Sequence, residues 1–179
     1  MSGFLQTRAA LEGDVGALTA LYRHYVLTHT STFEIEPPDQ AEMTERLRKV
    51  LGARLPYLIA ERDGQLVGYC YATPYRPRAA YRYTVENSVY VAPDCVGLGI
   101  GRTLLAELLM ICRTSGYREV IAIIGDSANT PSIALHRGAG FTHVGTLTNV
   151  GFKFDRWLDT VIMQKSLQQI STGARGNTG

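Results

Sequence analysis

The chain has 179 residues, of which 45% are hydrophobic and 19% are charged, with a net charge of +2. This length fits a single domain, which we expect over residues 1–170, with a core large enough to be stable. The small net charge argues against a protein built mainly to bind nucleic acid, because such proteins carry a concentrated basic face.

The cysteines Cys70, Cys95 and Cys112 include no CxxC pair, and an odd, scattered set is typical of reduced thiols in the cytoplasm. The N-terminus lacks the pattern of a signal peptide, and no apolar run approaches the ~18 residues of a membrane helix. We therefore expect a cytoplasmic protein with no membrane partner. The histidines show no pairing that suggests a metal site. The polar tail, residues 171–179, is expected to be flexible.

The first third of the chain predicts one strand and two helices. Residues 4–10 are a short strand, and Asp14 is a plausible N-cap for a helix that continues to about His29. Residues 30–38 form a loop, because their two prolines break any helix. Asp39, with Glu42 three residues later, predicts the start of a second helix.

The remaining elements follow from hydrophobic periodicity and turn residues. Residues 57–75 predict a hairpin that turns at Asp63-Gly64. Strands are expected over residues 84–91, 119–125, 141–150 and 156–167, and helices over residues 103–115 and 131–139. The order β-α-α-β-β-β-α-β-α-β-β indicates an α+β, or mixed α/β, domain built around one sheet.

Three alternating glycines, Gly97, Gly99 and Gly101, lie between the strand at 84–91 and the following helix. Such a turn exposes backbone N–H groups beside the positive end of a helix, an arrangement that most often binds phosphate. A plain strand-to-helix turn is the alternative. The dinucleotide fingerprint GxGxxG fails because Arg102 occupies its third glycine position, and the P-loop fails because its lysine is missing.

The segment "VYVAPDCVGLGIGRTLLAEL" resembles motif A of the GNAT acyl-CoA N-acetyltransferases, with its Q/R-x-x-G-x-G/A loop, and "NTPSIALHRGAGF" resembles their second signature. The stretches "HTSTFEIEPP", "YRPRAAYRYTVENSVYV" and "GFKFDRWLDTVIMQ" are similar to the phosphinothricin and methionine sulfoximine acetyltransferases. The resemblance spans residues 4–167. It implies the GNAT fold, a bent mixed sheet of about seven strands, splayed between the fourth and fifth, with about four helices.

The resemblance also implies a site for acetyl-CoA and no metal. The pantetheine lies along the fourth strand and pairs with its backbone, and the pyrophosphate lies on the glycine loop. Asn129 and Ser132 are at positions of further cofactor contacts, but they equally suit a cap for the helix at 131–139. The implied cofactor residues are Ser88, Val89, Tyr90, Val91, Val96, Gly97, Leu98, Gly99, Ile100, Gly101, Arg102, Asn129 and Ser132.

Acetyl transfer to an amine needs a base for the amine proton and a donor for the developing oxyanion. Strand alternation puts Glu86 on the same face as Ser88 and Tyr90. The resemblance implies that Glu86 is the base, through a water molecule, and a partly exposed structural carboxylate is the alternative. The backbone N–H of Tyr90 or Val91 is the expected oxyanion donor.

Many members of the superfamily place a tyrosine before the G-F pair to protonate the leaving thiolate. Here that position is His136. The histidine either acts as an acid or relay for protons, or packs on the helix surface beside the cofactor, and the sequence leaves both interpretations open.

The segment "YRPRAAYRY" combines three arginines with three tyrosines. It suits a small anionic acceptor better than nucleic acid, because arginine binds carboxylate or phosphinate in a bidentate way. The resemblance indicates Arg76, Arg78 and Tyr81 as substrate contacts together with Glu86, with Phe33 closing over the acceptor side chain.

We therefore expect an acetyl-CoA-dependent N-acetyltransferase that acts on the α-amine of phosphinothricin, methionine sulfoximine or methionine sulfone. A different acceptor, such as a protein N-terminus, and a non-catalytic acyl-CoA-binding module are the alternatives. Relatives of this kind usually form dimers, so a homodimer is expected.

Overall fold

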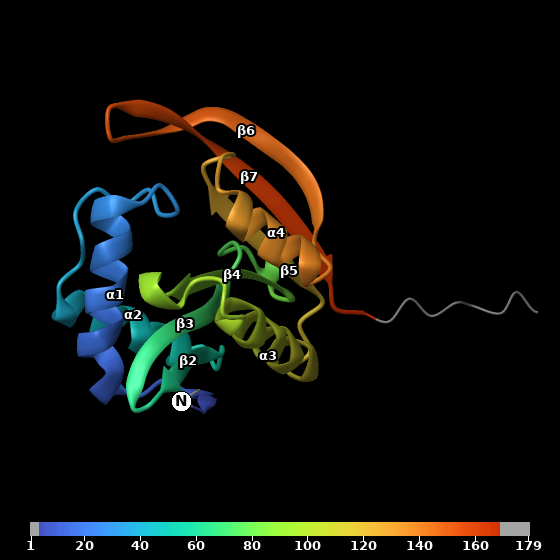
Figure 1. The fold of residues 1–179 in the computed structure, drawn as a ribbon. Coiled ribbons are helices and arrows are strands. Elements are labelled where there is room, and N and C mark those ends of the chain that lie inside the picture. Colours follow the sequence, from blue (N-terminus) through green and yellow to red (C-terminus); the bar gives the residue numbers. More distant parts are fainter. Residues whose placement is uncertain (1–3, 169–179) are drawn as a thin grey trace, which may run out of the picture.

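The computed structural model of the chain describes residues 4–168 (Figure 1). It confirms the expected element order. The elements are β1 (Leu5–Ala9), α1 (Val15–Thr28), α2 (Gln40–Gly52), β2 (Tyr57–Arg62), β3 (Gln65–Pro74), β4 (Thr84–Val91), α3 (Ile100–Thr114), β5 (Glu119–Gly125), α4 (Thr130–Gly138), β6 (Thr142–Lys153) and β7 (Arg156–Ser166), with the 3-10 turns η1 (Glu12–Asp14), η2 (Ala79–Tyr81) and η3 (Pro93–Cys95). The tail expected to be flexible lies outside the described residues.

The seven strands form one mixed sheet in the order β1-β2-β3-β4-β5-β7-β6. Neighbouring strands are antiparallel except β4 and β5, which are parallel and pair from Thr84–Glu119 to Asn87–Ala122. Within the described residues, the ladder between these two strands ends there. The remainder of β4 therefore diverges from β5, and the expected splay lies between the fourth and fifth strands.

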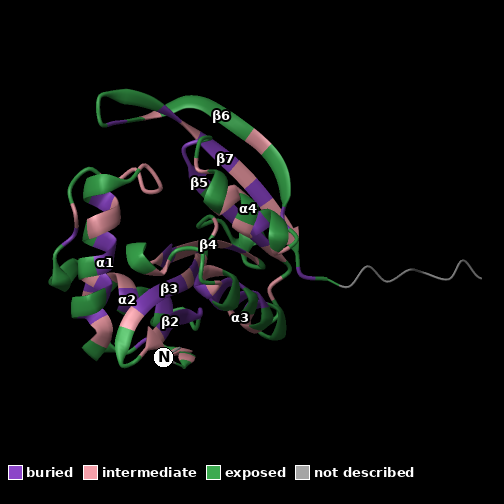
Figure 2. Ribbon diagram, in the orientation of Figure 1, coloured by how far each residue is buried: buried purple, intermediate pink, exposed green. Residues whose placement is uncertain are grey.

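Helices cover both faces of the sheet. The helices α1 and α2 lie together on one face of β2 and β3, and α3 lies on the other face (Figure 1). Buried residues are concentrated in the central strands and in the helices that pack on them, whereas β6 is largely exposed (Figure 2). The hairpin of β6 and β7 curves over the sheet beyond α4. Among the described residues, no helix is long and apolar enough to cross a membrane.

Several predicted boundaries shift in the structure. The helix expected from Thr103 begins at Ile100, so Gly101 belongs to its first turn. Asp39 caps α2 as predicted, since its side chain accepts from Glu42 N–H at 2.8 Å. Asp14 stands at the N-cap of α1, but its carboxylate pairs with Arg8 instead of capping the helix.

The two sharp hairpin turns use left-handed backbone. At the β2–β3 turn, Asp63 and Gly64 have φ of 52° and 74°, as the type I′ turn predicted from the Asp-Gly pair requires. At the β6–β7 turn, Phe154 and Asp155 have φ of 52° and 56°, although this pair gives no comparable sequence signal. The strand β6 ends at Lys153, directly before this turn, and not at residue 150 as predicted.

Candidate active site

Beyond its ladder with β5, the edge of β4 that faces the splay has no strand partner among residues 4–168. Ala92 N–H donates to Val67 O at 2.8 Å, which fixes the phase of the β3–β4 ladder. Hydrogen-bonded pairs alternate along an antiparallel ladder, so Tyr90 directs its backbone groups toward β3. Val89 and Val91 direct theirs toward the splay. The strand thus offers a pairing edge to an extended ligand.

The glycine loop combines two kinds of glycine. Gly97 and Gly99 have φ of +85° and +83°, a conformation that only glycine adopts readily, and a Cβ on either would meet no neighbouring atom. Gly101 is helical, and a Cβ there would lie 3.3 Å from Leu135 of α4. The first two glycines therefore shape the turn, whereas Gly101 allows α3 and α4 to pack closely.

The start of α3 is suited to bind an anion. The first hydrogen bond of the helix runs from Thr103 N–H to Gly99 O at 3.0 Å. Consequently, within residues 4–168, the N–H groups of Ile100, Gly101 and Arg102 have no partner inside the helix. These donors and the positive end of the helix fit the pyrophosphate of a CoA thioester.

A cavity of about 890 Å³ joins the free edge of β4 to the glycine loop. One side of it is formed by Val89, Val91 and the start of α3, and the other by the segment after β5 and by α4. Of the expected cofactor residues, the cavity is lined by Val89, Val91, Val96, Gly97, Gly99, Ile100, Gly101, Arg102, Asn129 and Ser132. Ser88, Tyr90 and Leu98 are not among the lining residues. Asn129 also caps α4 by accepting from Ser132 N–H at 3.3 Å. Its position is therefore compatible with a helix cap and with a contact to the cofactor.

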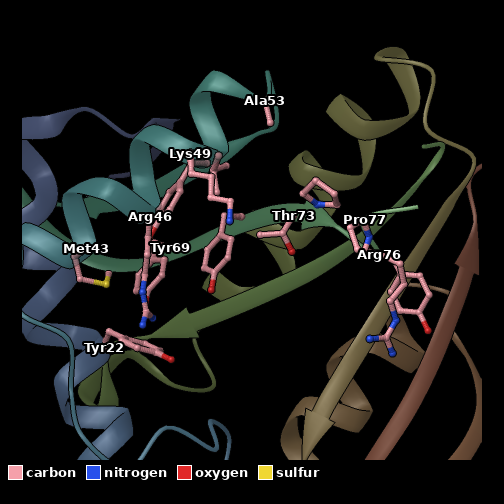
Figure 3. A pocket seen from close by; sticks show the side chains of 14 residues that line it. Tyr22, Met43, Arg46, Lys49, Ala53, Tyr69, Thr73, Arg76 and Pro77 are labelled. Atoms are coloured by element: carbon pink, nitrogen blue, oxygen red, sulfur yellow. The ribbon is translucent and has the colours of Figure 1, made fainter. Parts of the chain in front are cut away.

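A second cavity, of about 540 Å³, lies between α2 and the strand β3 (Figure 3). Its floor contains Tyr57, Tyr69 and Tyr71, whose rings stack with centroids 4.9–6.3 Å apart. Arg46 and Lys49 point into it from α2, and Arg76 lies at the opposite end of the cavity from Tyr22 (Figure 3). Arg46 is already paired with Glu34 and Glu42, so Lys49 and Arg76 are the cations that the described residues leave for a ligand. Together with the aromatic walls, they suit a small anionic molecule with an apolar part.

Glu86 lies beside the cavity beneath α2, on the strand whose later residues Val89 and Val91 line the larger cavity. It faces Thr73 across the β3–β4 ladder, and Thr73 lines the cavity beneath α2. Burial raises the pKa of the Glu86 carboxyl, and the nearby Arg76 guanidinium acts in the opposite direction. A carboxylate with a raised pKa beside a cavity is well suited to accept a proton near neutral pH.

His136 is buried in the structure, with 4% of its surface exposed. Its Nδ1 lies 2.8 Å from Ser132 O, an acceptor, so Nδ1 carries the proton and donates it. Its Nε2 then accepts from Asn87 Nδ2 at 2.9 Å. Burial lowers the pKa of His136, consistent with a neutral ring. The histidine holds β4 to α4 just where β4 and β5 diverge.

The expected acceptor residues are not all brought together. Arg76 lines the cavity beneath α2 and stacks on Tyr75 at 5.0 Å. Arg78 is exposed at the start of η2, and Tyr81, 42% exposed, contacts the ring of Tyr75 edge-on. Phe33 lies elsewhere, against the backbones of β5 and β6.

Sequence reasoning missed residues from segments distant along the chain. The Tyr25 hydroxyl donates to Val91 O at 2.7 Å and so takes up one of the free backbone groups of β4. Asp126, directly after β5, is 6% exposed and accepts from Thr30 and Arg156 in the wall of the larger cavity. The only signal for Asp126 was its place at the carboxyl end of a buried strand.

Comparison with known proteins agrees with this geometry. Residues 18–141 match the acetyltransferase (GNAT) family. The chain is 56% identical over 160 residues to a phosphinothricin N-acetyltransferase from Alcaligenes faecalis, covering 89% of this chain and 81% of the relative. It is 38% identical over 165 residues to an L-methionine sulfoximine/L-methionine sulfone acetyltransferase from Salmonella typhimurium, covering 90% and 94%.

A solved structure extends the likeness to the fold. The phosphinothricin acetyltransferase of Sinorhizobium meliloti, crystallised with acetyl-CoA, superposes with a TM-score of 0.88 at 40% identity, covering 99% of this chain and 98% of that one. Together with the splayed sheet, the glycine loop at the start of α3 and the partly buried Glu86 of β4, these matches show that the chain belongs to the GNAT family of acetyltransferases.

Proposed function

We propose that the protein transfers an acetyl group from acetyl-CoA to the α-amine of a small amino acid analogue of the phosphinothricin, methionine sulfoximine or methionine sulfone type. The observation that carries the proposal is the position of Glu86. It lies beside the cavity lined by cations and aromatic rings, three residues before the part of β4 that lines the cavity suited to a CoA thioester. The named activities of the relatives support this choice of acceptor.

Acetyl-CoA supplies an activated thioester, and the residues of the chain must accept the amine proton and stabilise the carbonyl oxygen. We assign the first task to Glu86, directly or through one water molecule. The amine nitrogen bonds to the carbonyl carbon, its proton passes to the carboxylate, and the carbon–sulfur bond breaks. The CoA thiolate takes up the proton, which regenerates the carboxylate.

We assign the oxyanion contact to the N–H of Val91. Of the two donors expected from the sequence, Tyr90 N–H is directed to β3 by the phase of the ladder. Val91 lines the cofactor cavity and directs its N–H there. The bonds of His136 to Ser132 and Asn87 support a role in holding α4 against β4, and favour it over direct proton donation.

We expect Arg76→Ala to raise KM for the acceptor by ~10-fold or more, because a charge-assisted bond to its acid group is lost. The same change removes the cation that lowers the pKa of Glu86, so that pKa rises further. Because the base must be deprotonated, the acidic limb of kcat/KM should move to higher pH. Steady-state kinetics between about pH 5 and 9 measure both effects.

Arg82→Ala is the matched control, since Arg82 lies in the same loop and also stacks on a tyrosine, Tyr83, at 4.6 Å. It should change neither KM nor the pH profile. We keep Arg78 and Tyr81 as proposed secondary contacts of the acceptor at the exposed end of this loop. Phe33 stays a proposed acceptor contact from the side of β5 and β6, where its ring lies. If Arg78→Ala raised KM and Arg76→Ala did not, the acceptor's acid group would bind at the exposed end of the loop.

We also propose that the protein works as a homodimer in the cytoplasm. The β6–β7 hairpin leaves large apolar side chains about half exposed, which indicates a surface covered by a second copy. These residues are Val144, Leu147, Val150, Phe152, Phe154 and Trp157. Analytical ultracentrifugation at assay concentration should give the mass of a dimer. A monomer would contradict this proposal. The unpaired thiols of Cys70, Cys95 and Cys112 support the reducing location.

A screen of amine acceptors with detection of released CoA thiol tests the function. Phosphinothricin, methionine sulfoximine and methionine sulfone should each release thiol faster than a polyamine, because the cations around the acceptor cavity repel a cationic acceptor. Faster release with a peptide bearing a free N-terminus would indicate a protein acceptor. Binding of CoA without release for any acceptor would indicate a non-catalytic acyl-CoA-binding module.

A further inference from the structure

The loop of residues 29–34, which we call the strap, crosses from the end of α1 to the far side of the splay. His29, Thr30 and Ser31 line the larger cavity opposite Val89 and Val91. Ser31 Oγ is buried and, among the described residues, has no hydrogen-bond partner. A buried hydroxyl of this kind suits an amide group of an extended ligand. The strap is therefore a wall of the cavity that we assign to acetyl-CoA.

The strap is held in place by a buried lysine of the β6–β7 hairpin. Lys153 is 4% exposed, and its Nζ donates to His29 O at 2.9 Å and to Thr32 O at 2.8 Å. The ammonium also lies 4.9 Å from the centre of the Phe154 ring. A buried cation is costly unless it is bonded, so the strap carbonyls and the lysine require one another.

Two further contacts attach the strap to the side of the splay that carries β5 and β6. Thr30 Oγ1 donates to Asp126 Oδ2 at 2.8 Å. The Phe33 ring lies in a notch between Gly125 of β5 and Gly151 of β6, where a Cβ on either glycine would clash with the ring. The strap thus joins α1 to β5 and β6, and its position depends on the hairpin.

We infer that Lys153 is a positioning residue for the cofactor, acting through the strap. The inference rests on the proposed function, which identifies the larger cavity as the acetyl-CoA site. Lys153 does not itself line either cavity, but its ammonium bonds the backbone at both ends of the 29–32 turn, including His29 of the cavity wall. Without its ammonium, two buried carbonyls lose their donor and the wall opposite Val89 is no longer fixed.

Calorimetric titration with CoA tests this inference on the wild type and on Lys153→Met, Lys153→Arg and Lys165→Met. The methionine keeps the length of the side chain and should weaken CoA binding by ~10-fold or more, with amide hydrogen exchange of residues 29–34 accelerated. Arginine, which can donate to both carbonyls, should restore most of the affinity. Lys165 is a partly exposed lysine of β7. Lys165→Met removes an equal charge and should leave CoA affinity unchanged. At saturating acetyl-CoA, kcat should stay near that of the wild type.

Unchanged CoA affinity in Lys153→Met with accelerated exchange in the strap would overturn the inference. If that variant does not fold, Phe33→Leu loosens the strap from the notch and should weaken CoA binding by a few-fold. An unaltered affinity there would also overturn it. Failure of the wild type to bind CoA would overturn the proposed function itself. Wild-type binding without acetyl transfer would overturn only the proposed catalysis and leave the role of Lys153 testable.

Discussion

Replacing Glu86 with glutamine should lower kcat by ~10²–10⁴ and leave CoA affinity almost unchanged. The substitution keeps the size of the side chain and removes only its ability to accept a proton. Because burial raises the pKa of the carboxyl, we expect the wild-type rate to fall on the acidic side as Glu86 becomes protonated. The variant should lose that acidic limb. Rapid-quench or steady-state kinetics across the pH range measure the effect.

Glu119→Gln provides the matched control. Glu119 is also a strand carboxylate, and it lies on β5 at the start of the β4–β5 ladder, away from the splay. Its carboxylate accepts from Gln164 Nε2 of β7 at 3.0 Å. Its substitution should leave turnover near that of the wild type. Near-normal turnover of the Glu86 variant at neutral pH would mean that the carboxylate of Glu86 is structural only.

Gly99→Val should weaken CoA binding by well over ~10-fold. Gly99 has φ of +83°, which a β-branched residue adopts only with strain, so the N–H groups at the start of α3 would turn away from the phosphate. Gly64→Val is the control, because Gly64 has φ of +74° and open space around it but lies in the β2–β3 turn. It should cost stability without changing CoA affinity.

The same titration distinguishes backbone from side-chain binding. Val96 occupies the position where the family pattern has glutamine or arginine, and Leu98 a position where many members carry a second arginine. Both side chains are more than half exposed. An arginine at 98 would meet a solvent-exposed phosphate, so Leu98→Arg should gain less than ~10-fold in affinity. A large gain from Leu98→Arg together with little loss from Gly99→Val would show that side chains control cofactor binding.

The element order could be predicted because each element has its own periodicity or turn signal. The Asp-Gly pair at 63–64 predicted a hairpin correctly, since the turn type demands those residues. The start of α3 was placed three residues late, because Gly101 was read as part of the turn. In the structure Gly101 is helical, and its missing side chain serves the contact with Leu135, a long-range feature that local sequence does not reveal.

The candidate site was predicted in part. The glycine loop and the edge of β4 were found because they are contiguous segments with a family pattern. The selection of Val89 and Val91 over Ser88 and Tyr90 needed the phase of the ladder, which depends on pairing with β3. The strap and Lys153 could not be predicted, because their contacts join positions more than a hundred residues apart in sequence.

The central claim is that this chain acetylates the α-amine of a small amino acid analogue, and product analysis tests it most directly. The purified protein is incubated with acetyl-CoA and phosphinothricin, and released thiol and N-acetylated product are quantified together by absorbance and mass spectrometry. The account predicts one acetylated product for each thiol released, abolished by Glu86→Gln. Thiol release without acetylated phosphinothricin, or equal product formation by Glu86→Gln, would contradict it.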